Sequence, residues 1–444
     1  MSSLKTFPLG GVHPDECKFT EQKAIEPLPI PERVYIPLSQ SLGAPSVPVV
    51  NKGDRVKTGQ LIAKGEAFIS ANIHSSVTGI VEKIEEWPDV SGYRKKTIII
   101  KTEPDEWVDG IIRSSELIKD ISKSREEIIQ LVKDNGIVGL GGATFPTHVK
   151  LSIPQGKKVE YLIINGVECE PYLTSDHRLM LEKGEEIMVG IRLLMKAIDV
   201  TKAIIGIEAN KPNAIEHLSK LAQQYNGIEV QGLKLKYPQG AEKQLIKALV
   251  NREVPSGKLP FEVGCVVQNV GTAYAVYEAV QLNKPLIERV VTLSGKGIAG
   301  GNFMVRIGTP IQALIDKCGG LPEQIGKIIN GGPMMGKALV STEVPVTKGT
   351  SGILLFPKEE SSRMPVYNCI RCGKCVSVCP MGLEPIILEK AAEVQNWDLA
   401  EKYHVLDCIE CGSCHYTCPA GRPLLDMIRL GKNKVNQIIR SRAK

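Results

Sequence analysis

Two short cysteine runs near the end of this 444-residue chain constrain its fold most strongly. Both have the spacing C-x2-C-x2-C-x3-C followed by proline. NCIRCGKCVSVCPMG supplies Cys369, Cys372, Cys375 and Cys379, and DCIECGSCHYTCPAG supplies Cys408, Cys411, Cys414 and Cys418. In this spacing a tight loop wraps thiolates around one face of a [4Fe–4S] cluster. The sequence therefore predicts two [4Fe–4S] clusters and the transfer of single electrons.

Zinc sites and disulfide frameworks are the alternatives for so many cysteines. Zinc sites separate their C-x2-C pairs by longer stretches. Disulfide frameworks suit small secreted domains, whereas this chain is long and its first residues, MSSLKTFPLGGVHPDECKF, lack the apolar segment of a signal peptide. Iron–sulfur clusters fit the spacing better than either alternative.

The paired runs resemble those of two-cluster ferredoxins, in which the fourth cysteine of each run ligates the cluster of the other run. The resemblance implies two crossed ligand sets. One set is Cys369, Cys372, Cys375 and Cys418, and the other is Cys408, Cys411, Cys414 and Cys379.

Length and composition limit the rest of the chain. A chain of 444 residues predicts two to four domains. No stretch approaches the roughly 18 apolar residues of a membrane-spanning helix, so we expect no transmembrane segment. The net charge of +6 is mild, and neither a helix-turn-helix pattern nor a strongly basic face points to nucleic acid.

The order of secondary-structure patterns predicts a multidomain α/β protein. Short alternating runs over residues 33–102 resemble a biotinyl- or lipoyl-type barrel-sandwich module, with Phe68 near the place of the lysine that such modules modify. We therefore expect a structural or docking module within residues 1–110. A helix is expected over 115–135.

Strands and helices then alternate, which predicts a Rossmann-like layered domain over residues 111–287. The expected strands are 159–166, 202–209 and 228–235, and the expected helices are 177–198, 211–225, 241–250 and 270–282. Residues 288–352 resemble a β-grasp (SLBB) module. The cluster-binding, largely helical unit covers 353–444 and ends in a basic tail expected to be mobile.

A glycine-dense loop, GIVGLGGATFPTHVK at residues 136–150, is the first hint of a nucleotide site, because glycines let a backbone approach a phosphate closely. This loop and three later segments resemble, in order, segments of the flavin- and NADH-binding subunit of respiratory complex I. The later segments are INGVECEP (164–171), PQGAEKQL (238–245) and PSGKLPFEVGCVVQNVGT (255–272). Four matches in order are more specific than any one.

This resemblance implies bound FMN and a site for NAD(H). The residues implied for FMN are Gly139, Gly141, Gly142, Lys150, Asn165, Glu168, Gly240, Asn269 and Thr272. Those implied for NAD(H) are Phe145 and Phe261, which would stack on it, and Glu170, Glu242 and Lys258, which would contact its polar parts. Val167, Cys169 and Ala241 depart from the family's pattern.

The whole domain order resembles the RnfC family, the NADH- and FMN-binding iron–sulfur subunit of the Rnf ferredoxin:NAD oxidoreductase complex. The resemblance implies a peripheral protein at the cytoplasmic face of the cell membrane. Its implied partners are the integral and iron–sulfur Rnf subunits, NAD(H) and, indirectly, ferredoxin. FMN would exchange a hydride with NAD(H) and single electrons with the clusters, since the redox chemistry belongs to the cofactors.

Two alternatives remain open from the residues. The cobalamin reductase of microcompartments also joins such a flavin domain to two ferredoxin motifs, but its flavin domain tends to open the chain. An electron-wiring subunit without flavin is the second alternative, because Val167 and Ala241 replace acidic residues of the family's flavin site.

Overall fold

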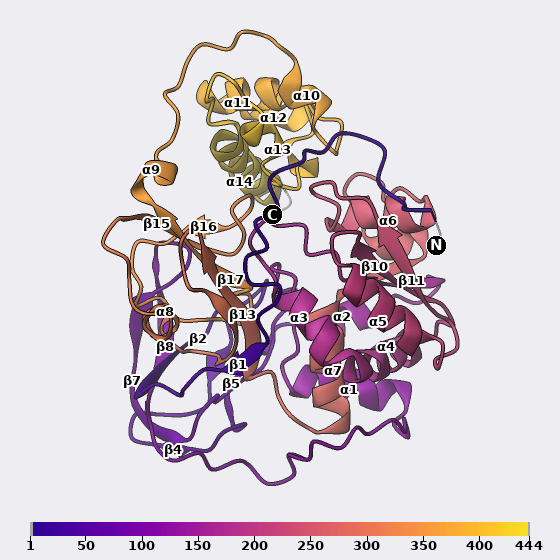
Figure 1. The fold of residues 1–444 in the computed structure, drawn as a ribbon, viewed down its shortest axis with the longest axis vertical. Coiled ribbons are helices and arrows are strands. Elements are labelled where there is room, and N and C mark those ends of the chain that lie inside the picture. Colours follow the sequence, from indigo (N-terminus) through magenta and orange to yellow (C-terminus); the bar gives the residue numbers. More distant parts are fainter. Residues whose placement is uncertain (1–2, 443–444) are drawn as a thin grey trace.

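Two antiparallel sheets face one another in the N-terminal module of the computed structural model, which describes residues 3–442 (Figure 1). The first contains β2 (Arg33–Pro37), β8 (Arg94–Thr102), β7 (Gly79–Pro88) and β4 (Arg55–Val56), and the second contains β3 (Val47–Pro48), β5 (Leu61–Lys64) and β6 (Ile73–His74). Alternating apolar side chains such as Val34, Ile36 and Ile98 fill the space between the sheets. The barrel-sandwich prediction is confirmed.

A parallel four-stranded sheet forms the centre of the next domain. Its spatial order is β11 (Ile228–Leu233), β10 (Ala203–Glu208), β9 (Tyr161–Asn165) and β12 (Cys265–Asn269). One face is covered by α1 (Arg125–Asp134), α4 (Gly184–Ile198), α5 (Pro212–Ala222) and α7 (Val270–Gln281), and the other face by α6 (Glu242–Val250). The layered α/β prediction is confirmed.

Two predicted helices differ from the observed ones. The helix expected over 115–135 begins only after Ser124, because the Ser124 hydroxyl and the Glu127 carboxylate cap its first turn reciprocally. The helix expected over 177–198 is split at Lys183 into α3 (Ser175–Glu182) and α4.

A six-stranded mixed sheet forms the third module. Its order is β1 (Ile25–Pro27), β14 (Gly301–Arg306), β13 (Glu288–Gly295), β17 (Gly352–Pro357), β15 (Ile325–Asn330) and β16 (Lys337–Ala338), with α8 (Ile311–Lys317) packed on it. The sheet therefore includes β17, which begins at the predicted boundary residue Gly352 and extends beyond it, and β1 from the N-terminal segment.

The N-terminal segment before β1 runs across several modules. Lys5 bridges to Leu233 of β11, and the Gly11 N–H donates to the Val378 carbonyl at 2.8 Å. β1 then pairs in parallel with β14. This segment thus contacts the α/β domain, the first cysteine run and the six-stranded sheet.

Short helices form the C-terminal module, at the top of Figure 1. They are α10 (Lys374–Ser377), α11 (Pro385–Glu393), α12 (Trp397–Lys402), η2 (Val405–Asp407), α13 (Ser413–Tyr416) and α14 (Leu424–Arg442). The expectation of a mobile basic tail is wrong up to Arg442, because α14 buries Ile428 and Val435 against its neighbours. Residues 443–444 of that predicted tail lie outside the described residues. Within residues 3–442, no helix is both long and apolar enough to cross a membrane.

Candidate redox centre

The candidate nucleotide site lies where the strand order of the parallel sheet reverses. From β9 the chain proceeds outward to β10 and β11, and it then returns to the other side of β9 as β12. Ligands of open α/β sheets bind at the carboxyl ends of the strands at such a switch point. Asn165 and Asn269 are the last residues of β9 and β12, and they pair in register at this edge.

These two asparagines hold the surrounding loops in place. The Asn165 side chain donates to the Gly240 carbonyl at 2.8 Å, which joins the end of β9 to the turn before α6. The Asn269 side chain caps α7 by accepting from the Gly271 N–H at 2.8 Å, and it donates to Asp176 Oδ2 at 2.7 Å. The predicted residues Asn165, Gly240 and Asn269 are therefore brought together.

The glycine-rich loop reaches the same edge, at the N-terminus of α7. The Leu140 N–H donates to the hydroxyl of buried Thr272 at 2.9 Å. Gly141 faces the Asn269 side chain. Gly142 has a φ of +105°, and a side chain there would meet nothing within 4 Å. The loop thus presents backbone and open space at a helix N-terminus, an arrangement that suits an anionic ligand.

Glu168 has a structural role that the sequence did not reveal. Its carboxylate accepts from the Asp176 N–H at 2.7 Å and from the His177 N–H at 3.1 Å, and so caps the first turn of α3. Burial and the neighbouring Glu168 charge raise the pKa of the Asp176 carboxyl. Asp176 was missed by sequence reasoning, and its place in an ordinary helical run gave no signal.

Two lysines, half-buried Lys18 and buried Lys211, were also missed by sequence reasoning and hold the INGVECEP loop in place. Lys18 Nζ donates to three main-chain carbonyls, those of Glu168, Glu170 and Leu173, at 2.7–3.0 Å. Lys211 Nζ donates to the Val167 carbonyl at 2.8 Å. Burial lowers the pKa of Lys18 to about 8. Lys18 lies some 150 residues from its partners in sequence, so no local pattern could have connected them.

Lys150 and Glu242 form an ion pair with an Nζ–Oε2 distance of 2.7 Å. The Lys150 ammonium also donates to the Val267 carbonyl of β12 at 3.1 Å. Sequence reasoning placed Lys150 beside FMN and Glu242 beside NAD(H), whereas the structure places their charged groups against each other.

Glu170 lies where the α/β domain meets the turn between β15 and β16, close to the C-terminal module. Its carboxylate accepts from the N–H groups of Met334 and Met335 at 3.0 and 2.9 Å. Burial raises its pKa to about 7. The Tyr237 hydroxyl, 3.4 Å from the same carboxylate, donates to the Cys411 carbonyl at 2.9 Å. A chain of polar contacts therefore joins this loop to the second cysteine run.

Phe145 and Phe261 are not brought together. The Phe145 carbonyl accepts from the Gly139 N–H, at the carboxyl edge of the sheet. Phe261 lies in η1 (Pro260–Val263), directly before β12, and shares an open cavity with Glu160 and Arg252 at the amino edge. Exposed Lys258 precedes η1. The expected pair of stacking rings around one nucleotide is therefore absent among the described residues.

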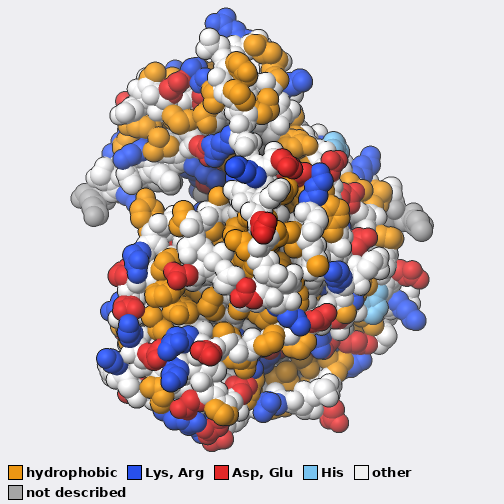
Figure 2. Space-filling model, turned by 60° about the vertical axis from the view of Figure 1, so that its left-hand side comes forward, with side chains coloured by type: hydrophobic (Ala, Val, Ile, Leu, Met, Phe, Trp, Pro, Cys, Tyr) orange, Lys and Arg blue, Asp and Glu red, His pale blue; other side chains and the backbone are white. Residues whose placement is uncertain are grey.

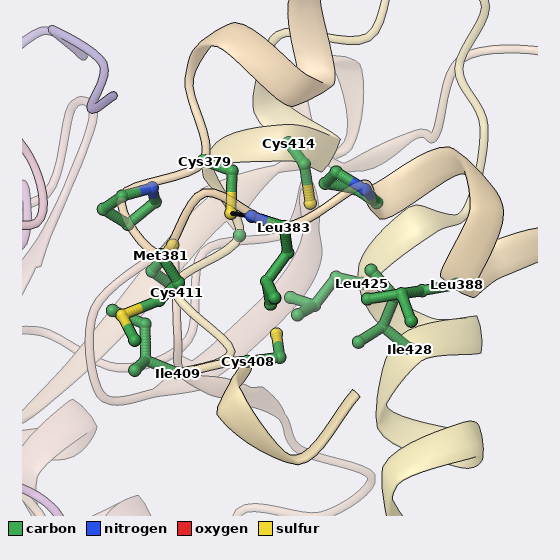
Figure 3. Close-up of a pocket in the computed structure, with 13 residues that line it drawn as sticks. Cys379, Met381, Leu383, Leu388, Cys408, Ile409, Cys411, Cys414, Leu425 and Ile428 are labelled. Carbon is green, nitrogen blue, oxygen red and sulfur yellow. Dashed lines mark hydrogen bonds between the residues drawn. The ribbon is translucent and has the colours of Figure 1, made fainter. Parts of the chain in front are cut away.

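Four cysteines from both runs line one enclosed cavity beneath α14. These are Cys379, Cys408, Cys411 and Cys414. Figure 3 shows the sulfur atoms of Cys379, Cys408 and Cys414 pointing toward one another, with the Leu383 side chain between them in this view and Ile428 to one side. The Leu383 N–H donates to Cys379 Sγ at 3.4 Å. Burial raises the pKa of the Cys408 thiol to about 11, so a bound cation is needed to hold it as a thiolate at neutral pH.

The remaining four cysteines of the runs line a second, more open cavity. These are Cys369, Cys372, Cys375 and Cys418. Cys372 is exposed. Apolar side chains exposed on this part of the chain are Met364, Val366, Tyr367, Ile370 and Val376. Hydrophobic and basic side chains gather on this uppermost lobe in Figure 2. Over residues 3–442, no three His, Cys, Asp or Glu side chains are arranged to hold a single metal ion.

Comparison with known families agrees with the predicted order of modules. Residues 5–105 match the RnfC barrel sandwich hybrid domain, and residues 132–278 match the Nuo51 FMN-binding domain. Residues 290–338 match the SLBB domain, and residues 363–419 match a 4Fe–4S dicluster domain. The predicted architecture is confirmed, as are its FMN-binding and 4Fe–4S components.

Individual relatives cover nearly the whole chain. A component of the proton-translocating ferredoxin:NAD(+) oxidoreductase complex of Clostridium ljungdahlii is 50% identical over 91% of this chain and 88% of the relative. The corresponding component of the Na(+)-translocating complex of Acetobacterium woodii is 46% identical over 96% of both chains. An NAD+-reducing [NiFe]-hydrogenase in the H2-reduced state covers 70% of this chain and 63% of its own at 20% identity, with a TM-score of 0.47, a likeness too distant to support an argument. The chain belongs to the RnfC family, whose members are components of ion-translocating oxidoreductase complexes.

Proposed function

We propose that this chain exchanges electrons between NAD(H) and iron–sulfur partners within an Rnf complex. FMN supplies hydride exchange with NAD(H) and single-electron exchange with clusters. The observation that carries the proposal is the pair of cysteine-lined cavities. In one, three of the four cysteines are buried and the lining segments contact Tyr237 and Gln244 of the flavin domain, whereas in the other Cys372 is exposed. This arrangement suits an electron path that enters at a protected site and leaves at an accessible one.

In this proposal each cluster takes ligands from both runs. Cys408, Cys411, Cys414 and Cys379 hold the inner cluster, and Cys369, Cys372, Cys375 and Cys418 hold the outer cluster. The shared lining of each cavity supports these two sets. The inner set lies nearer the flavin domain, because the Tyr237 hydroxyl of that domain reaches the Cys411 carbonyl.

The FMN site is proposed at the carboxyl edge of the parallel sheet. The glycine-rich loop (Gly139, Gly141, Gly142) surrounds the phosphate at the N-terminus of α7, with N–H groups from Gly141 and Gly142. Asn165, Asn269 and Gly240 supply polar groups for the ring and ribityl chain. Thr272 holds the loop, and Glu168 holds α3 at the same edge. The Lys150–Glu242 pair borders the site, at the edge of β12.

The proposed binding partners are inferred from the cavity around exposed Cys372 and from membership of the RnfC family. We propose that the exposed apolar and basic surface around Cys372 docks an iron–sulfur subunit of the complex, which in turn serves ferredoxin. Integral subunits would anchor the protein at the cytoplasmic face of the membrane. NAD(H) would approach the flavin edge beside Phe145.

Anaerobic reconstitution of the full chain tests the proposal. We expect about one FMN and roughly eight irons per chain, as two four-iron clusters require, together with bleaching of the flavin absorbance by NADH. Iron–sulfur signals without flavin and without NADH–ferricyanide reductase activity would identify an electron-wiring subunit instead, and bound zinc in place of iron would refute both.

A further inference from the structure

The tip of the barrel-sandwich module lies against the glycine-rich loop of the flavin domain. Two loops form this tip, residues 41–46 and 65–72. The Leu42 N–H, in the first loop, donates to the Thr144 carbonyl at 3.1 Å. Since Thr144 directly precedes Phe145, the tip adjoins the part of the flavin loop at which the nucleotide is proposed to bind.

A buried lysine holds the tip in this place. Lys348 Nζ donates to the Asn72 carbonyl of the tip at 2.8 Å and to the Gly136 carbonyl of the flavin domain at 2.7 Å. The Asn72 side chain also donates to the Asp134 carbonyl at 3.2 Å. These bonds cross between the two modules, so the tip is built into the edge of the flavin site.

Large apolar side chains are exposed at this junction. Phe68 is 72% exposed and Leu42 is 56% exposed. The Phe68 backbone lies close to His148, three residues after Phe145. An exposed phenylalanine on a rigid tip beside a ligand loop is well placed to cover a flat ring.

We propose that Phe68 and Leu42 form one wall of the dinucleotide site, and that Phe68 stacks on an aromatic ring of NAD(H). The inference rests on the proposed function. It replaces the ring expected from Phe261, which lies at the opposite edge of the sheet. A dinucleotide fits because it carries two flat rings, and stacking of such rings on aromatic side chains is favourable whatever the base.

The test compares Phe68→Ala and Phe68→Trp in the full chain loaded with FMN and clusters. Tyr93→Ala is the matched control, since Tyr93 is 73% exposed on the turn between β7 and β8 of the same module. Calorimetry measures the Kd for NAD+, and ferricyanide reduction gives the KM and kcat for NADH. FMN released on denaturation is measured in parallel.

We expect Phe68→Ala to raise the Kd and the KM about tenfold, equivalent to ~1.4 kcal/mol, with kcat within about twofold because the contact is made equally in ground and transition states. Phe68→Trp and Tyr93→Ala should match the parent, and all variants should keep their FMN.

An unchanged Kd in Phe68→Ala overturns the inference. So does lost FMN, which would place Phe68 at the flavin, or lost co-purification of other Rnf subunits at unchanged Kd, which would make the tip a protein-docking surface. A parent chain that holds FMN but binds no NAD+ refutes the proposed function itself and the inference with it.

Discussion

The crossed assignment of cluster ligands can be tested by pairing substitutions that share Cys379. In Cys379→Ala/Cys408→Ala, the two lost thiols come from different runs but line the same enclosed cavity. In Cys369→Ala/Cys379→Ala, the lost thiols come from one run but line different cavities. The variants remove the same number of cysteines, so each is the control for the other.

The expected iron content depends on which cavities lose cysteine ligands in each double variant. If both cavities hold four-iron clusters, the Cys379/Cys408 variant keeps about four of roughly eight irons, and the Cys369/Cys379 variant keeps close to none. Ligation within each run predicts the reverse. Anaerobic iron analysis and electron paramagnetic resonance of the reduced protein measure this, with FMN content reporting that the flavin domain has folded. Four irons in Cys369→Ala/Cys379→Ala would refute the crossed assignment.

Three further predictions concern single side chains. Asn269→Ala should cost about 1 kcal/mol through the lost cap of α7 and lower the FMN bound per chain; full retention of FMN, measured after denaturation, would argue against the site. Burial lowers the pKa of Lys348 from 10.5 to about 7, so the unfolded chain binds more protons than the folded chain between these values and stability should rise with pH in that window. Between pH 7 and pH 9 the free energy of unfolding of the parent, measured by thermal unfolding, should rise by about 2–3 kcal/mol more than that of Lys348→Met. An equal change in the two proteins would contradict this. Arg422→Met should destabilise the C-terminal module by about 3–5 kcal/mol, because it leaves the buried Glu389 carboxylate without its partner; an unchanged urea midpoint of that module would contradict it.

Local patterns were sufficient to predict most of the fold. Hydrophobic periodicity predicted the strands and helices of the flavin domain, because each buries one face against the parallel sheet. The errors occurred where capping residues or a buried helix face gave a helix other bounds than the overall sequence pattern suggested. Ser124 and Glu127 delayed the start of α1, and α14 was mistaken for a mobile tail since its exposed face is strongly charged while Ile428 and Val435 are buried.

The site was predictable only in part. Asn165, Gly240 and Asn269 converge as expected because each ends or precedes an element at the same sheet edge. Contacts made across the chain left no signal in the sequence. Lys18 is one such residue. Phe261 shows the opposite error: its segment resembles the family's motif, but it precedes β12 and therefore lies at the amino edge of the sheet, away from the proposed site.

The N-terminal segment has a consequence for the order of assembly. Gly11 bonds to the Val378 carbonyl, and β1 pairs with β14, so these residues leave the ribosome long before their partners have been synthesised. Domains generally fold as units during synthesis. Docking of this leading segment would therefore complete maturation, once the iron-binding loops exist, and a bulky tag fused ahead of it would interfere with cofactor loading in the C-terminal module.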